Sequence, residues 1–344
     1  MKQIRSYGVY LILILGMMGG PQALASRLII LADMGNEPDE VQQMAHMIMC
    51  SNEFELEGLI AVSGIYLRPN AKDPYRRVLH PELFTEIIDA YAFIGQHQWA
   101  LEHIKGNHGP VGRAWPIRQF DGGNISFLEG GGTIPWLGLV NKGLFSIDHP
   151  HWGGWSGRFS REKSRNYMSK RKRVRSDEEK VGDFSLYKEE SDRWINPENG
   201  DEYNDIFTPI WRWRRAFFNN FKCRMDWCLN PYDKANHHPV AAFHGDKSDT
   251  IVRRQANPGQ TISLDASASI DPDKDTLAIR WYTYPEAGTY LGKVTILDSK
   301  QTETRVTIPP DAAGKQIHVI LEVRDQNPIA SLYDYRRIVI DVSK

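Results

Sequence analysis

Residues 28–44, with the sequence LIILADMGNEPDEVQQM, constrain the fold more than any other part of the chain. They open with an apolar run that predicts a strand buried on both faces. The loop that follows is acidic and leads into an amphipathic helix. In open α/β sheets, ligands bind at the carboxyl edge of such strands, so this loop is a candidate site. Four carboxylates fall within eight residues of it: Asp33, Glu37, Asp39 and Glu40.

Carboxylates this close together repel one another, and a bound cation or a shared proton relieves the repulsion. The alternative is that Glu37, Asp39 and Glu40 only complement the dipole at the N-terminus of the helix. The residues alone leave both interpretations open.

The next elements predict a parallel sheet. A second apolar run at residues 56–63 predicts a strand, and strand, helix and strand at this spacing form a right-handed crossover. Ser63 is then expected at the same edge as Asp33. Pro81 predicts the start of a second helix.

After Gly95 the pattern changes, and no further buried strand is predicted before Gly157. Two parallel strands are too few for a stable sheet, whereas a doubly wound domain repeats the unit four times or more. The glycines at 130–132 lack the preceding strand and following lysine of a phosphate-binding loop.

Nine of the ten tryptophans lie between Trp99 and Trp227. Exposed aromatic faces suit sugar rings, and the alternative is that these side chains fill an irregular core. We favour a core position for Trp211 and Trp213. Both interpretations stay open for Trp152 and Trp155.

The C-terminal third alternates apolar and polar residues with period two. Such short strands between turn signals predict a β-sandwich over residues 240–344, after a linker at 231–239. The loop DPDKD could offer Asp271, Asp273 and Asp275 to Ca²⁺, or form a plain turn. The remaining residues, 26–230, then make up the first domain.

The N-terminus predicts a signal peptide over residues 1–25. A basic start, an apolar run and a small-x-small site that ends at Ala25 indicate export, so we expect a secreted or periplasmic protein without a membrane span. A formal net charge of −1 argues against nucleic acid as a partner. Cys223 and Cys228 could pair, whereas Cys50 is expected to be buried.

Several motifs resemble those of one known family. GNEPD at 35–39, HPELF at 80–84, NHGP at 107–110, WGGW at 152–155 and WRWR at 211–214 are similar to motifs of secreted bacterial proteins with a nucleoside-hydrolase-like domain followed by an immunoglobulin-like domain. Some members are described as cellulose-binding. The resemblance implies a doubly wound α/β sheet, then an all-β immunoglobulin-like sandwich.

The resemblance also implies a site. In nucleoside hydrolases the acidic loop binds Ca²⁺, and a metal-bound water attacks the sugar. Asp33 and Asp39 would be catalytic, and with Glu40 they would hold the metal. The first Asp of the hydrolase motif is Leu31 here. The residues that would contact substrate are Asn36, Glu37, Ser63, Trp152 and Trp155.

Family members carry further strand and helix units where this chain passes directly from one motif to the next, at residues 94–99. The centre of the sheet, with its remaining metal ligands, is therefore expected to be missing. The resemblance implies hydrolysis of N-glycosyl or related glycosyl bonds in a glycoside, nucleoside or polysaccharide. A non-catalytic cellulose-binding protein and an inactive truncated member are the alternatives.

Overall fold

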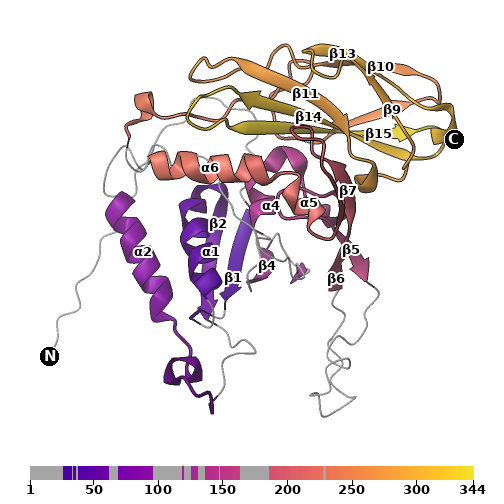
Figure 1. Cartoon of the computed structure of the whole chain (residues 1–344). Coiled ribbons are helices and arrows are strands. Elements are labelled where there is room, and N and C mark those ends of the chain that lie inside the picture. The colour runs from indigo at the N-terminus through magenta and orange to yellow at the C-terminus, as the bar shows by residue number, and fades with distance from the viewer. Residues whose placement is uncertain are drawn as a thin grey trace, which may run out of the picture.

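The computed structural model describes residues 26–32, 34–35, 38–61, 69–95, 118–119, 125–130, 136–146, 148–162, 186–227 and 230–344. A mixed α/β part lies below a strand-rich C-terminal part in Figure 1. Among these residues, no helix is both long and apolar enough to cross a membrane.

The first part is built on a four-stranded sheet with the order β2-β1-β4-β3. β1 (Ser26–Ala32) lies parallel to β2 (Phe54–Ala61) on one side and to β4 (Ile125–Gly130) on the other. A short antiparallel strand, β3 (Arg118–Gln119), forms the far edge. Helix α1 (Pro38–Met49) connects β1 to β2, as the sequence predicts.

A third parallel strand, β4, lies between Gly95 and Gly157, where the sequence predicted no further buried strand. Its sequence, ISFLEG, interrupts the apolar residues with Ser126 and Glu129, so it lacks the continuous apolar run of β1. The predicted second helix is confirmed as α2 (Glu82–Gly95), which packs against α1.

Short elements connect the sheet to the C-terminal part. Residues 196–201 form the turn of a hairpin, and two helices follow the hairpin. These elements are α4 (Leu137–Val140), β5 (Phe159–Glu162), β6 (Leu186–Glu189), β7 (Asp192–Ile195), β8 (Glu202–Asp205), α5 (Thr208–Trp211) and α6 (Arg214–Trp227).

The C-terminal part is a sandwich of two sheets, with strand orders β10-β13-β12 and β11-β14-β15-β9. Both sheets contribute to one apolar core, and the alternating residues predicted from the sequence fill it. The strands are β9 (Val252–Ala256), β10 (Thr261–Asp265), β11 (Leu277–Thr283), β12 (Thr295–Leu297), β13 (Glu303–Thr307), β14 (Gln316–Asp325) and β15 (Tyr333–Val342).

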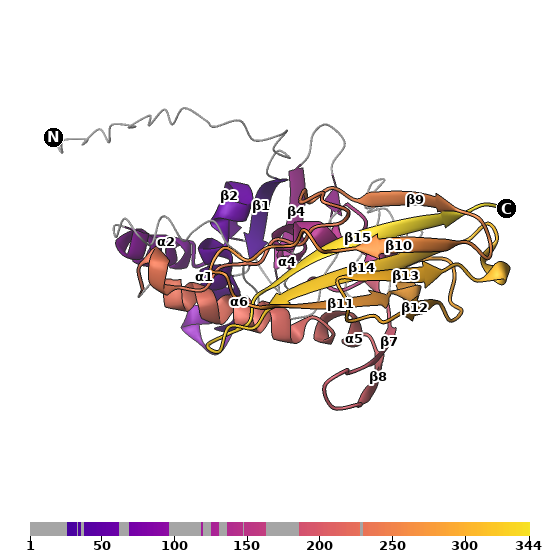
Figure 2. The same ribbon diagram turned by 90° about the horizontal axis from the view of Figure 1, so that it is seen from above.

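The outer face of the sandwich sheet β11-β14-β15-β9 packs on the α/β part. A second apolar cluster runs through both parts and joins Trp155 and Trp213 to Tyr284 and Tyr335 of the sandwich. Figures 1 and 2 show α6 between the strands of the sandwich on one side and helix α1 on the other. Arg224 on α6 donates to the carbonyl of Met49, whereas other α6 side chains contact residues 329–331.

The segment 231–239 is more than the linker that its composition predicts. Asn236 is buried and donates to the carboxylate of Asp325 at 2.8 Å. Trp227 on α6 donates to the carbonyl of Asn236 at 2.7 Å. The segment therefore packs as part of the interface between the two parts.

Candidate functional site

The carboxyl ends of three parallel strands meet at one edge of the α/β sheet. Ala32 at the end of β1 pairs in register with Ala61 of β2 and Gly130 of β4. The chain leaves β1 through the acidic loop and crosses to β2 on one side, while β4 occupies the other side. Open α/β sheets bind ligands at such a point, where the strand order reverses and neighbouring strands lie on opposite sides of the first one.

Four of the eight predicted site residues lie outside the described residues. These are Asp33, Asn36, Glu37 and Ser63. Asp39 and Glu40 fall in the first turn of α1, and the structure describes their backbone but not their side chains. Hard carboxylate oxygens are the ligands that Ca²⁺ prefers, so the donor chemistry of the loop fits that ion. Among the residues that the structure describes, no three acidic, histidine or cysteine side chains form a metal-binding group.

The turn at residues 34–35 packs against two stacked aromatic rings. Tyr75 and His80 stack with their centroids 3.7 Å apart and their planes at 14°. Gly35 adopts a left-handed φ of 86°, and a Cβ there would lie 2.8 Å from the His80 ring and 2.9 Å from the Tyr75 hydroxyl. Gly35 of the GNEPD motif thus packs against His80 of the HPELF motif, a residue to which the sequence assigned no role.

We expect Gly35→Ala to destabilise the protein by about 2–3 kcal/mol, since it combines left-handed strain with a steric clash. Gly200→Ala is the matched control, because Gly200 has a φ of 81° and a Cβ added there would meet no atom within 4 Å. Urea unfolding of both variants separates the contact from the strain. Equal losses would contradict the packing of Gly35 on the two rings.

His80 is buried, and both its ring nitrogens face acceptor oxygens. Nε2 lies 2.7 Å from the carbonyl of Tyr75, and Nδ1 lies 2.6 Å from the carboxylate of Glu82. Both nitrogens must donate, which only the imidazolium does. The hydrogen bond to Tyr75, then that to Glu82, raises the pKa of His80 above its ordinary 6.5.

The ring contacts of His80 should therefore stabilise the loop fully below pH 6.5 and lose that effect as the pH rises through the raised pKa. We expect the His80 ring to titrate above pH 6.5 by NMR. Burial lowers the pKa of His238 to about 4 and that of His318 to about 2, so these rings serve as neutral references. A His80 pKa at or below 6.5 would contradict the geometry.

The WGGW motif lies in the interface, away from solvent. Trp152 is 2% exposed and Trp155 is fully buried, so burial favours the core alternative for both. Arg337 of β15 donates to the carbonyl of Gly153 at 2.7 Å and to that of Leu144 at 2.8 Å. The motif thus anchors the sandwich and offers no open ring face to a sugar.

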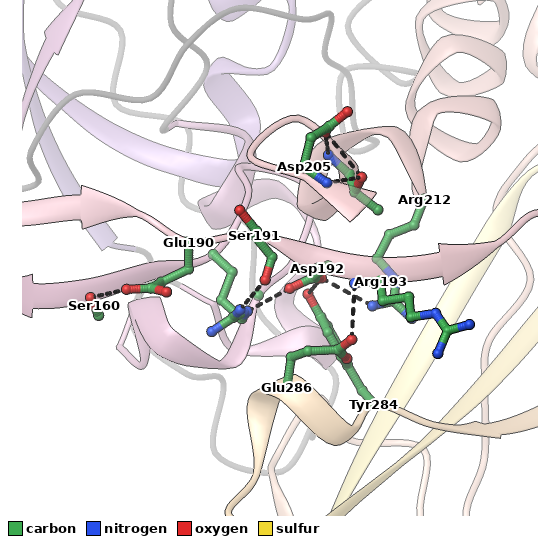
Figure 3. A network of polar contacts seen from close by, with 12 residues as sticks. Ser160, Glu190, Ser191, Asp192, Arg193, Asp205, Arg212, Tyr284 and Glu286 are labelled. Carbon is green, nitrogen blue, oxygen red and sulfur yellow. Dashed lines mark hydrogen bonds and ion pairs between the residues drawn. The ribbon is translucent and has the colours of Figure 1, made fainter. Parts of the chain in front are cut away.

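A buried polar network also joins the two parts (Figure 3). The fully buried Asp192 accepts hydrogen bonds from Arg158 Nε at 2.6 Å, from Arg212 Nη1 at 3.1 Å and from the hydroxyl of Tyr284. Burial and the Asp192 carboxylate raise the pKa of Tyr284 well above 10, so its hydroxyl remains a donor. No local sequence signal indicates this network, because its members are far apart in the chain.

The aspartates of the sandwich loop support a turn. Asp271 Oδ1 accepts from the backbone nitrogens of Asp273 at 2.9 Å and Asp275 at 3.0 Å. Asp273 also accepts from the backbone nitrogen of His237. These carboxylates thus serve the backbone and the interface.

Two of the three cysteines belong to the part of the chain that the structure describes. Cys50 and Cys223 are both buried, as predicted for Cys50. Cys228, the possible partner of Cys223, lies outside the described residues. Burial raises the pKa of Cys223 to about 12, so the residue behaves as a small apolar side chain.

Comparisons with solved structures show a shared fold. The chain is similar to a nucleoside hydrolase-related hypothetical protein from Saccharophagus degradans, described as associated with carbohydrate metabolism. Identity is 24%, over 92% of this chain and 100% of that chain, with a TM-score of 0.59. The PKD domain of human KIAA0319 matches 27% of this chain and 78% of its own at 10% identity, and its TM-score of 0.21 is too low to bear on the fold.

Family models match both parts of the chain. The nucleoside hydrolase-like domain of cellulose-binding Sde182 matches residues 27–97 and 93–159. The C-terminal domain of cellulose-binding protein Sde0182 matches residues 261–342. No match was found among curated proteins. With the two domain models matched in order along it, the chain belongs to the family of Sde0182-type cellulose-binding proteins with a nucleoside hydrolase-like domain.

Proposed function

We propose that the protein is a secreted hydrolase of N-glycosyl or related glycosyl bonds, with its active site at the carboxyl edge of β2, β1 and β4. The observation that carries this proposal is the position of β1 between two parallel strands, with the acidic loop leaving its carboxyl end. The export signal predicted at residues 1–25 would suit a protein that acts on carbohydrate outside the cell.

Asp33, Asp39 and Glu40 are the residues that would hold Ca²⁺. A bound cation supplies charge that lowers the pKa of coordinated water. Asp33 would accept a proton from the attacking water, and Asp39 would lie beside the sugar hydroxyls or the metal. The other carboxylates stabilise positive charge that develops on the sugar in the transition state.

The test is release of free base or nitrophenol from ribonucleosides and nitrophenyl glycosides, with Ca²⁺ and with a chelator. We expect Ca²⁺-dependent turnover that falls about 10²–10⁴-fold in Asp33→Asn, the usual contribution of a general base. Asp201→Asn is the control, because Asp201 is exposed in the hairpin turn, far from the sheet edge in sequence. Activity that is unchanged both by the chelator and by the Asp33→Asn substitution would overturn the proposal.

Non-catalytic polysaccharide binding is the second candidate. It is supported by the cellulose-binding description of both family models, and by the division of the first match into two pieces that meet at residues 93–97. A missing centre of the domain would remove Ca²⁺ ligands, and this ion needs about 6–8 oxygens. Retention on cellulose in chelator, without turnover on any glycoside, favours the binding protein over the enzyme.

A further inference from the structure

A pocket of about 570 Å³ lies at the junction of the two parts, within the size range of small-molecule sites. One wall is formed by the hairpin β7–β8 and the helices α5 and α6. The opposite wall is the outer face of β11, β14 and β15. The hydrolase proposed above does not use this pocket.

Aromatic side chains line the hairpin side of the pocket. Trp194 on β7 and Tyr203 on β8 are cross-strand partners whose rings stack at 5.8 Å, and Trp211 meets Tyr203 edge-on at 5.7 Å. All three are half-buried, unlike Trp152 and Trp155. Partly exposed indole and phenol faces suit the apolar faces of sugar rings. The prediction of a core position for Trp211 is therefore only partly met.

The pocket carries an excess of positive charge. Its two carboxylates, Glu198 and Glu322, are already paired with Arg215 and Arg280. A third cation of the lining, Arg212, is paired with the buried Asp192. Among the described residues, the three remaining cations, at positions 214, 300 and 324, have no carboxylate within ion-pair distance. The six basic side chains of the lining are Arg212, Arg214, Arg215, Arg280, Lys300 and Arg324.

We infer that this pocket binds an acidic oligosaccharide, with sugar rings against Trp194, Tyr203 and Trp211 and sugar carboxylates at Arg214, Lys300 and Arg324. A neutral glucan could use the aromatic faces but would leave the three cations without a counter-charge. Hydrogen bonds between guanidinium and carboxylate are about twice as strong as neutral ones. The site therefore favours uronic acid units over neutral sugars.

The network of Figure 3 fixes the hairpin side of the pocket. Asp192 and Trp194 are two residues apart on β7, so their side chains share one face of the strand. Asp192 is held by Arg158 and Arg212. Trp194 is thus placed by a buried anchor, which lowers the ordering cost of ligand binding.

The test is calorimetric titration of the whole protein with trigalacturonate and with cellotriose, in chelator so that hydrolysis at the β1 edge plays no part. We expect one site for the acidic trimer, with affinity about tenfold or more above that of the neutral one and reduced by salt. Equal affinity for the two trimers would overturn the inference. Tighter binding of a nucleotide, ADP, than of either trimer would also overturn it.

Variants locate the binding. We expect Trp194→Ala and the double variant Arg214→Gln with Arg324→Gln each to weaken trigalacturonate binding about tenfold or more, at a melting temperature near that of the parent. Arg305→Gln is the matched control, because Arg305 is exposed on β13 of the other sheet. Unchanged affinity in both pocket variants would place the ligand elsewhere and contradict the inference.

Discussion

Asp192→Asn should lower the free energy of unfolding by about 3–5 kcal/mol, the usual cost of removing one partner from a buried ion pair. The change preserves the shape of the side chain but leaves Arg158 and Arg212 without their carboxylate. These two side chains are only 11% and 6% exposed, so water cannot replace the lost charge. Urea unfolding measures the loss.

Glu202→Gln in the same hairpin is the matched control. Glu202 pairs with Arg193, but the two side chains are 48% and 66% exposed. Exposed pairs contribute about 0–1 kcal/mol, so this variant should unfold nearly as the parent does. A loss below 1 kcal/mol in Asp192→Asn would show that the network does not hold the two parts together.

Trp213→Ala should cost about 3–5 kcal/mol, as for other buried tryptophans. Trp213 lies between α5 and α6 with only 1% exposure. Its ring meets the edge of Tyr335 at 5.4 Å and lies 6.1 Å from Tyr284, both in the sandwich. The cavity would therefore open in the cluster that both parts share.

Phe218→Ala on α6 controls for the loss of an aromatic ring, because Phe218 is 38% exposed. Its removal should cost about 1 kcal/mol or less. Thermal unfolding followed by tryptophan fluorescence and by far-ultraviolet circular dichroism reports both variants. Similar losses for the two would mean that the shared cluster contributes little to stability.

The sandwich could be predicted from the sequence because its inner residues alternate with period two. Ile279 and Trp281 on β11 face the sandwich core, as do Val319 and Leu321 on β14. The intervening residues look like a solvent face. Arg280, Tyr282 and Glu322 instead face the α/β part. The local sequence pattern could not indicate this, because the residues that cover that face are distant in the chain.

The acidic edge was predictable in part. The apolar run of β1 and the helix after it are strong local signals, and both are confirmed. β4 was missed because its apolar residues are interrupted. The burial of the tryptophans was the hardest feature to predict, because tertiary packing decides that Trp152 is buried whereas Trp194 is half-buried.

Calorimetric titration of the protein with Ca²⁺ tests the central proposal most directly. We expect one Ca²⁺ per chain, binding that raises the melting temperature, and loss of both effects in Asp33→Ala. Asp275→Asn should bind like the parent, because the Asp275 carboxylate lies in the sandwich and accepts a hydrogen bond from Asn327 at 2.8 Å. Absence of binding, or equal binding in Asp33→Ala, would contradict a metal site at the carboxyl edge of β1.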